Sequence, residues 1–170
     1  MEYLNERLMK YEITIGIDNG LDGGLCAISA HNVSVIDKWA MPTFERSGKR
    51  EVDTRTIYDW MMDFHSTLLI LIEEPLRHAK SSQAMRSMGI SYGKILGMCE
   101  SHELKVKPIQ VKDWQKIMLG KVPKSQTKKF ALKKAQELAP DEDWRKNNRC
   151  TVPHDGIVDA YLIAHYGTKI

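Results

Sequence analysis

The amino-acid sequence predicts an α/β protein in which helices flank a mixed β-sheet. Three strand-like segments follow one another near the start of the chain, which indicates an antiparallel meander. A later run, LLILI at Leu68–Ile72, is short and continuously apolar, as in a strand of a parallel sheet that is buried on both faces. Helical and strand-like segments then alternate. We expect one domain, residues 13–170, after an N-terminal extension at residues 1–12.

The composition is that of a soluble globular domain, with 42% hydrophobic and 28% charged residues. No apolar run has the roughly 18 residues of a transmembrane helix, and the charged first residues are unlike a secretory signal, so we expect no membrane association. The three cysteines, Cys26, Cys99 and Cys150, are far apart, which argues against disulfides and a cysteine zinc site. We therefore expect a cytoplasmic protein, or one in the host cytoplasm if a phage encodes it.

The strand assignments rest on segments rich in isoleucine and valine that are separated by short turns. The first three predicted strands are Ile13–Asp18, Leu25–Ala30 and Val33–Ala40. The polar segment PTFERSGKREVD, Pro42–Asp53, is interpreted as a loop. The segment KVKPIQ, Lys105–Gln110, is interpreted as a further strand after Leu68–Ile72.

The helix assignments rest on apolar residues that recur every three or four positions. The predicted helices cover about Thr54–Ser66, Ser82–Ser101, Val111–Leu119, Gln126–Leu138 and Pro153–Tyr166. The longest of them carries Gly89, Gly93 and Gly97, which are spaced four apart. Because glycine weakens a helix, this stripe indicates the close approach of another backbone, either the sheet or a partner in a dimer.

Two acidic residues end predicted strands. Asp18 ends the first strand, on the face that also carries Thr14 and Gly16, because side chains alternate along a strand. An unpaired buried carboxylate is costly, so Asp18 is either a turn residue or part of a charged site. Glu73 ends the buried apolar strand, and the adjacent Glu74, which points to the opposite face, is an alternative to it.

The last predicted helix carries a pair of acids at positions i and i+4, Asp155 and Asp159. Either Asp155 caps the helix and Asp159 is solvated, or both belong to a site. Asp159 lies in the apolar stretch IVDAYLIA, where a carboxylate needs a partner. If the four acids converge, they repel one another, and a divalent cation removes this conflict. Oxygen ligands suit Mg²⁺ or Mn²⁺, and two such ions about 4 Å apart support phosphodiester hydrolysis.

The motifs around these acids resemble those of RuvC-like Holliday junction resolvases, a branch of the RNase H-like nucleases. GIDNGLDGGLCAI resembles the first motif, LIEEP the second and HDGIVDAYLIAHYG the third. Between them, SSQAMRSMGISYGKILGMCE and VKPIQVKDWQKIML resemble the middle region of phage-type and related bacterial or organellar members, so the similarity covers about Ile13–Gly167. The resemblance implies a five-stranded mixed sheet of RNase H-like fold. It also implies a homodimer that nicks four-way DNA junctions symmetrically in DNA recombination and repair.

The resemblance implies catalytic and metal-binding roles for Asp18, Glu73, Asp155 and Asp159. This sequence departs from the family pattern at Asn19, where many members have proline, and in the last motif, where the acids of some branches are three apart. His154 adjoins the acidic pair and either assists metal binding or leaving-group protonation, or caps the helix. No small-molecule cofactor is implied.

Positive charge is concentrated between Lys105 and Lys134, where ten lysines accompany one acid. This segment is either a solvated helical face or a surface for phosphate groups. The candidate DNA-binding residues are Arg77, Lys80, Arg86, Lys112, Lys116, Lys121, Lys124, Lys128 and Lys129. Lysine recognises phosphate without reading bases, so these residues predict affinity without sequence preference. Trp114 and Phe130 either stack on splayed bases or belong to the core.

The sequence leaves two other functions open and argues against a third. A broader nuclease that cuts flaps, forks or replication intermediates would use the same metal chemistry. A junction-binding module without catalysis would need the lysines but not the acids. A member of the sugar kinase, actin and chaperone ATPase superfamily would need a second domain and a second phosphate loop, which 170 residues do not offer.

Overall fold

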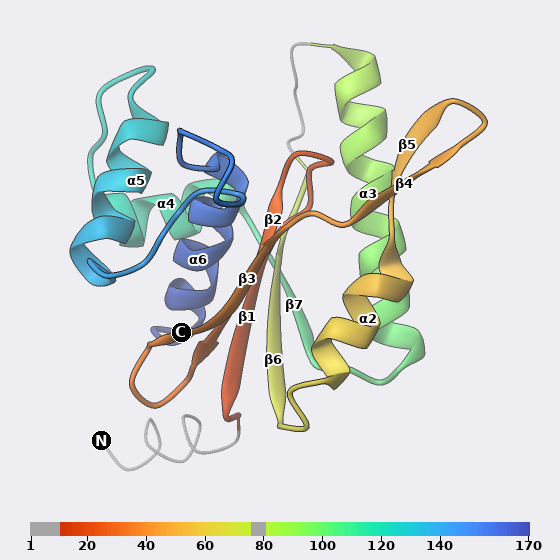
Figure 1. The fold of residues 1–170 in the computed structure, drawn as a ribbon, viewed down its shortest axis with the longest axis horizontal. Helices are drawn as coiled ribbons and strands as arrows, with labels where there is room; N and C mark the ends of the chain where they lie inside the picture. The colour runs from red at the N-terminus through yellow and green to blue at the C-terminus, as the bar shows by residue number, and fades with distance from the viewer. Residues whose placement is uncertain (1–10, 76–80) are drawn as a thin grey trace.

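The structure, a computed structural model, describes residues 11–75 and 81–170, so that residues 1–10 of the predicted extension lie outside the described residues. The strands of the described residues are β1 Ile13–Asp18, β2 Gly24–Ser29, β3 Val35–Ala40, β4 Thr43–Arg46, β5 Lys49–Val52, β6 Leu68–Glu73 and β7 Val106–Ile109. Five of them form one sheet in the order β3-β2-β1-β6-β7 (Figure 1). β1–β2 and β2–β3 pair antiparallel, whereas β1–β6 and β6–β7 pair parallel. The mixed sheet predicted from the sequence is therefore confirmed.

Helices cover both faces of this sheet (Figure 1). Those of the described residues are α2 Thr54–Met62, α3 Ser82–Ser101, α4 Val111–Leu119, α5 Thr127–Leu138 and α6 Asp155–Gly167. α2 and α3 lie on one face, and α4, α5 and α6 lie on the other (Figure 1). The first helix ends at Met62, earlier than the predicted end near Ser66, and His65 then adopts a positive φ of 48°. Within the described residues, no helix has both the length and the apolar character needed to cross a bilayer.

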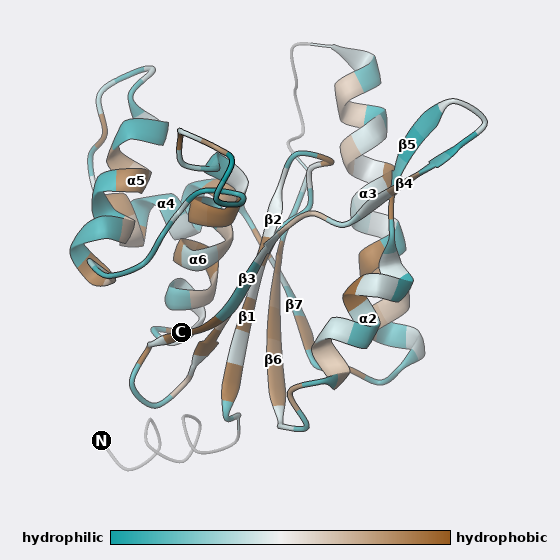
Figure 2. Cartoon of the chain, viewed as in Figure 1, coloured by the Kyte–Doolittle hydropathy of each residue, from teal (hydrophilic) through white to brown (hydrophobic). Residues whose placement is uncertain are grey.

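The apolar side chains form two clusters, one on each face of the sheet. Alternation along β1 sends Ile15 and Ile17 into the cluster beneath α2 and α3. Leu71 of β6 belongs to the opposite cluster, which is built around α6. Figure 2 shows the corresponding apolar colouring along β1, β6 and α6, whereas α5 is largely hydrophilic. The same alternation places Asp18 and Glu73 on the α6 side of the sheet.

Helix α6 lies directly against the backbone of β1 and β2. A Cβ atom on Gly16 would lie 2.0 Å from the carbonyl oxygen of Ala160, and one on Gly24 would lie 2.6 Å from the carbonyl oxygen of Gly156. Neither position can hold a side chain while the helix stays where it is. Gly23 and Gly156 also form an isolated backbone bridge. These contacts fix the first turns of α6 beside the end of β1.

The segment between Pro42 and Asp53, predicted as a loop, contains a β-hairpin. β4 and β5 pair antiparallel around Ser47 and Gly48, whose φ angles are 50° and 72°. Positive φ at both central residues is the type I′ geometry that closes a two-residue hairpin. The sequence prediction was wrong because the strands TFER and KREV are polar and lack an apolar alternation. The hairpin projects from the main sheet beside α3 (Figure 1).

The glycine stripe of α3 faces away from the sheet. The helix packs on its neighbours through Ile95 and Cys99, which are buried. Gly89, Gly93 and Gly97 are exposed, and a Cβ atom at any of them would have no described atom within 4 Å. The interpretation that this stripe packs on the sheet is therefore wrong. A contact with a second copy stays a prediction.

Candidate active site

Asp18 lies at the end of β1, where the chain enters the glycine-rich turn. Its Oδ1 accepts a hydrogen bond from the Gly20 N–H at 3.2 Å, which orients the carboxylate. Burial raises the pKa of Asp18 above the usual range for aspartate, although the Gly20 hydrogen bond lowers it, and the charge of Asp155 raises it further. Asp18 therefore carries the electrostatic cost of a buried acid that has no cationic partner at hydrogen-bond distance among the described residues.

Glu73 ends β6, the parallel neighbour of β1. Its Oε2 accepts a hydrogen bond from Nε1 of Trp114, on α4, at 2.7 Å. Burial raises the pKa of Glu73 to about 8, and the charge of Asp18 adds to this increase, whereas the Trp114 hydrogen bond lowers it. In the absence of a cation, the Glu73 carboxyl group therefore keeps its proton to a higher pH than an ordinary glutamate.

Asn19 joins the ends of β1 and β6. Its side chain is only 1% exposed, and its Nδ2 donates a hydrogen bond to the backbone carbonyl oxygen of Glu73. The last backbone pair between the two strands is Ile17 with Ile72, so the asparagine extends the link beyond it. Many RuvC-like resolvases, whose motifs this sequence resembles, have proline at this position. Proline has no side-chain amide to make this hydrogen bond.

The two acids of α6 lie in different environments. Burial raises the pKa of Asp159 to about 7, and the charges of Asp18 and Asp155 raise it further. Asp155, the first residue of α6, is half exposed and accepts a hydrogen bond from Nζ of Lys128, on α5, at 2.6 Å. Asp159 thus faces other carboxylates, whereas Asp155 is neutralised by a lysine.

His154 is the N-cap residue of α6. Its Nδ1 accepts a hydrogen bond from the Ile157 N–H at 3.3 Å. Burial lowers the pKa of His154, and the positive charge of Lys146 lowers it further, so the imidazole is mainly neutral at neutral pH. The structure therefore supports the capping alternative. The part of His154 in metal binding or protonation stays a prediction.

The structure brings the four predicted acids into one electrostatic group at the ends of β1 and β6 and the start of α6. The charge of Asp18 raises the pKa of Glu73 and of Asp159, and the charge of Asp155 raises the pKa of Asp18 and of Asp159. Among the described residues, Asp155 is the only member of this group with an ion pair. We call these four residues the acidic group.

The acidic group suits a divalent cation by the chemistry of its donors. All four members offer carboxylate oxygens, the ligands that Mg²⁺ and Mn²⁺ prefer, and their mutual repulsion would be relieved by positive charge. In the conformation described, no three acidic, histidine or cysteine side chains of residues 11–75 and 81–170 converge into a formed metal site. The fit thus rests on donor type and electrostatics.

Six of the predicted DNA-binding lysines lie on the same side of the sheet as α6 (Figure 1). All six are exposed, on α4, on α5 and on the segment between them: Lys112, Lys116, Lys121, Lys124, Lys128 and Lys129. Arg86 is also exposed, but it lies on α3, which covers the opposite face. The predicted Arg77 and Lys80 lie outside the described residues. Lys128 is thus the predicted DNA-binding residue that contacts the acidic group.

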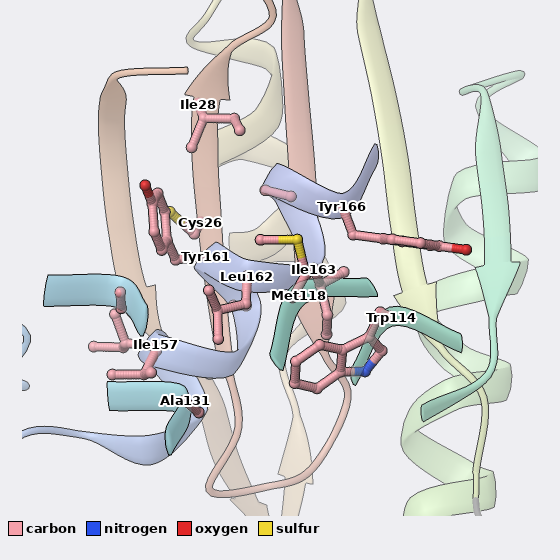
Figure 3. Close-up of a cluster of buried hydrophobic side chains, with 14 of the residues drawn as sticks. Cys26, Ile28, Trp114, Met118, Ala131, Ile157, Tyr161, Leu162, Ile163 and Tyr166 are labelled. Carbon is pink, nitrogen blue, oxygen red and sulfur yellow. The ribbon is translucent and has the colours of Figure 1, made fainter. Parts of the chain in front are cut away.

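Trp114 does not stack on bases, because its side chain is fully buried in the cluster around α6 (Figure 3). The alternative of a core position is correct for this residue. Phe130 is partly buried on α5. The hydrogen bond between Trp114 and Glu73 leaves no signal in the sequence, because the two residues are 41 positions apart and are brought together only by the fold.

Two cationic features near the acidic group were missed by the sequence analysis. The segment RKNNR, Arg145–Arg149, precedes α6, and its three positive charges in five residues are a sequence signal for a cationic surface. In the β1–β2 turn, a hydrogen bond from Arg50 lowers the pKa of Asp22, and the charge of Lys146 lowers it further. Arg50 reaches this turn from the hairpin and donates from Nη2 to Asp22 Oδ1 at 2.6 Å and to the carbonyl oxygen of Leu21. This contact could not be predicted while the hairpin was taken for a loop.

The metal-free protein is expected to become less stable as the pH rises from about 5 to about 8. Burial raises the pKa of Glu73 to about 8 and that of Asp159 to about 7, whereas unfolded carboxyl groups titrate near pH ~4. Each group therefore binds its proton more tightly in the folded state. The resulting stabilisation is complete below the unfolded-state pKa and is lost as the pH rises through the folded-state pKa. Urea unfolding in EDTA should show a decrease of about 2 kcal/mol or more.

The matched control for this pH dependence is Glu73→Gln, which removes the titrating group but keeps its shape. This variant should show a flatter profile, and Mg²⁺ should restore stability to the wild type at pH 8 because a bound cation stabilises the ionised acids. A wild-type free energy of unfolding that is constant from pH 5 to 8 in EDTA would contradict the assignment.

Comparison with protein-family models and with curated proteins gave no match to this sequence. Among solved structures, the chain is similar to T. thermophilus RuvC in complex with a Holliday junction substrate, with a TM-score of 0.60 and 11% identity over 89% of both chains. It is also similar to another Thermus thermophilus RuvC structure, with a TM-score of 0.58 and 13% identity over 92% of this chain and 97% of that chain. The chain therefore has the fold of these resolvases, as the sequence motifs predicted.

Proposed function

We propose that this protein is a metal-dependent endonuclease that resolves four-way DNA junctions by nicking two strands symmetrically, in recombination and repair. The observation that supports the proposal is the electrostatic coupling of the acidic group at the ends of the interior strands β1 and β6 and at the start of α6. The sequence motifs support it, and one of the similar structures is a RuvC in complex with a Holliday junction substrate. Fold alone does not determine substrate, so the junction has to be tested directly.

The four members of the acidic group are the proposed ligands of Mg²⁺, with two ions per site and Mn²⁺ as a substitute. When bound, such ions supply an activated water and stabilise the departing oxygen of the phosphodiester. The chain itself positions the carboxylates through β1, β6 and α6. Lys128 donates a hydrogen bond to Asp155 and presents positive charge beside the group, where a phosphate would enter.

The proposed DNA surface consists of the nine candidate residues Arg77, Lys80, Arg86, Lys112, Lys116, Lys121, Lys124, Lys128 and Lys129. These cations neutralise phosphates and do not select bases. The proposed partner is a branched DNA, bound next to the acidic group through Lys128 and its neighbours on α5.

We propose a homodimer, because symmetric nicking needs two sites on one junction. The exposed stripe of Gly89, Gly93 and Gly97 on α3 supports this proposal, since it would allow a second backbone to approach closely. A cytoplasmic location, in the host if a phage encodes the protein, is proposed from the three cysteines, which are all free.

The proposal is tested by cleavage of an end-labelled immobile four-way junction, with and without Mg²⁺. A linear duplex, a flap and a fork of the same sequence are the matched substrates. We expect paired nicks at symmetric positions that require Mg²⁺ or Mn²⁺ and appear on the junction alone. Equal cleavage of flaps and forks would indicate a broader branch nuclease. Tight junction binding without a cut in either metal would indicate a non-catalytic binding module.

Removal of Lys121 and Lys124 together, by alanine substitution, is expected to weaken binding to junctions of any sequence. Both lysines are exposed, and each lost phosphate contact reduces the slope of log K against log salt by about 0.9. Fluorescence anisotropy in EDTA at several salt concentrations measures this slope, which should decrease by roughly 1 to 2.

The matched control for the lysine variant is Lys133→Ala. Lys133 is also exposed and lies on α5, but it forms an ion pair with Glu137 and is not among the candidate DNA-binding residues. The control should bind with the wild-type salt slope. If the double variant keeps the wild-type slope as well, the lysines of this segment form a solvated face and do not contact DNA.

A further inference from the structure

Trp114 lies beneath the acidic group at the centre of the cluster around α6. Its side chain is 0% exposed, and its Nε1 is 2.7 Å from Oε2 of Glu73. Figure 3 shows the indole among apolar side chains that include Met118 and Ile163. The indole of Trp114 can donate one hydrogen bond and accept none, and in this position its acceptor is a carboxylate of the acidic group.

Burial of a tryptophan in this cluster does not by itself require a carboxylate partner. Trp144 belongs to the same cluster and is 3% exposed, yet its Nε1 finds no acceptor among the described residues. The Trp144 ring packs on Tyr161, with the ring centroids 4.8 Å apart. Of the two indoles in this cluster, Trp114 is thus the one that donates to an acid. On the other face of the sheet, the buried Trp60 donates from Nε1 to Asp37 Oδ2 at 2.8 Å, outside the acidic group.

Glu73 is held at two points as a result. Asn19 donates to its backbone carbonyl oxygen, and Trp114 donates to one oxygen of its carboxylate. The hydrogen bond from the indole occupies Oε2, and Oε1 has no hydrogen-bond or ion-pair partner among the described residues. Outer-shell donors of this kind fix the orientation of a ligating carboxylate, and their loss typically lowers metal affinity or activity about 10- to 100-fold.

We propose that Trp114 is a positioning residue that holds the Glu73 carboxylate in place for metal binding. This inference rests on the proposed function, because it assigns Trp114 a part in the same acidic group. Trp114 touches neither substrate nor metal, and it acts through Glu73.

The test compares Trp114→Phe with Trp144→Phe in the full chain. Both substitutions remove an indole N–H from the same core and keep an aromatic ring. For Trp114→Phe we expect the Mg²⁺ concentration at half-maximal junction cleavage to increase about 10-fold or more, with an unchanged KM for DNA. Trp144→Phe should keep the wild-type Mg²⁺ midpoint. A folded Trp114→Phe protein with the wild-type midpoint would overturn the proposal and leave the proposed function intact.

A readout that does not depend on cleavage is the indole N–H signal in ¹H–¹⁵N spectra. The chain has four tryptophans, so each signal can be assigned from a Trp→Phe variant. When Mg²⁺ is added to the free protein, the chemical shift of the Trp114 indole N–H should change, and the midpoint of this change should equal the midpoint of Mg²⁺ binding. Glu73→Gln should remove the change. A Trp114 signal that stays constant while Mg²⁺ binds would overturn the proposal.

If Trp114→Phe does not fold, the indole can be replaced by 3-benzothienylalanine, in which sulfur takes the place of the N–H group. This analogue keeps the shape of the side chain and removes only the donor. A raised Mg²⁺ midpoint in the analogue supports the proposal, and a wild-type midpoint overturns it. A wild-type protein that neither binds Mg²⁺ nor cleaves would overturn the proposed function, and the part of Trp114 with it.

Discussion

The Asp18→Asn variant is expected to lose Mg²⁺-dependent junction cleavage and to fold normally. Asparagine keeps the shape of the side chain and an oxygen that can accept the Gly20 hydrogen bond, so the β1–β2 turn should be preserved. It removes the charge that a divalent cation needs at the centre of the acidic group. Electrostatic assistance by a bound cation is worth several kcal/mol, which corresponds to a loss of roughly 10³-fold in the cleavage rate. Single-turnover cleavage of the labelled junction measures this loss.

The stability of the same variant should change in the opposite direction. Because burial and the charges of neighbouring acids raise the pKa of Asp18, a neutral asparagine relieves repulsion once the pH is high enough to ionise the aspartate. We therefore expect the metal-free Asp18→Asn protein to have a higher Tm than the wild type at pH 8, and this difference in Tm should become smaller as the pH falls. Loss of cleavage together with gain of stability is typical of a functional acid and not of a structural one.

The matched control is Asp22→Asn, the same substitution four residues later. Asp22 is exposed and lies in the turn, where it pairs with Arg50. This control should cleave at a rate close to that of the wild type. If Asp18→Asn cleaved at the wild-type rate, Asp18 would be a turn residue, and the proposed metal site would be wrong.

The second large effect is expected from Gly16→Ala, which should destabilise the protein by about 3 kcal/mol or more. The added Cβ atom would lie 2.0 Å from the carbonyl oxygen of Ala160 and 2.4 Å from the backbone nitrogen of Ala164. Both are backbone atoms of α6, so no side-chain rotation can relieve the overlap, and the helix must move away from β1. Thermal unfolding should show a decrease in Tm of roughly 6 to 12 °C for a chain of this size.

Gly93→Ala is the control for this substitution within the monomer, where it is expected to have the opposite sign. A lower Tm for Gly93→Ala would instead indicate that the stripe contacts a second copy. Gly93 lies within α3, where an added Cβ atom would meet no described atom within 4 Å. Alanine at an exposed helical position stabilises by about 0.5 to 1 kcal/mol relative to glycine. A Gly16→Ala protein with the Tm of the wild type would contradict the direct contact between α6 and β1.

The main sheet could be predicted because each of its strands leaves a local signal. β1 and β6 are short apolar runs that end in an acid, and their alternation already placed Asp18 and Glu73. The hairpin β4–β5 left no such signal, because its strands are polar and its stability comes from pairing and from the turn at Ser47 and Gly48. The alternation of apolar and polar residues in a sequence indicates which side chains are buried. A hairpin that projects into solvent buries few side chains and so shows little alternation.

The members of the candidate site could be predicted as a set, but their partners could not. Strand ends and helix spacing indicated that Asp155 and Asp159 could join the strand acids. The pairing of Asp155 with Lys128 joins two helices across 27 positions, and no periodicity encodes it. The glycine stripe of α3 shows the same limit, since spacing identifies a face of the helix but not what covers that face.

The direct backbone contact between α6 and the sheet also limits how the sequence of such a protein can evolve. Where two backbones touch, the requirement on the sequence is the absence of a side chain, and here it falls on Gly16, Gly24 and Gly156. The surrounding apolar positions can exchange one side chain for another of similar volume at modest cost, because they do not set the distance between helix and strand. The distance between the acids of the strands and those of α6 therefore depends on a few positions that must remain glycine. The other core positions can change during evolution without altering that distance.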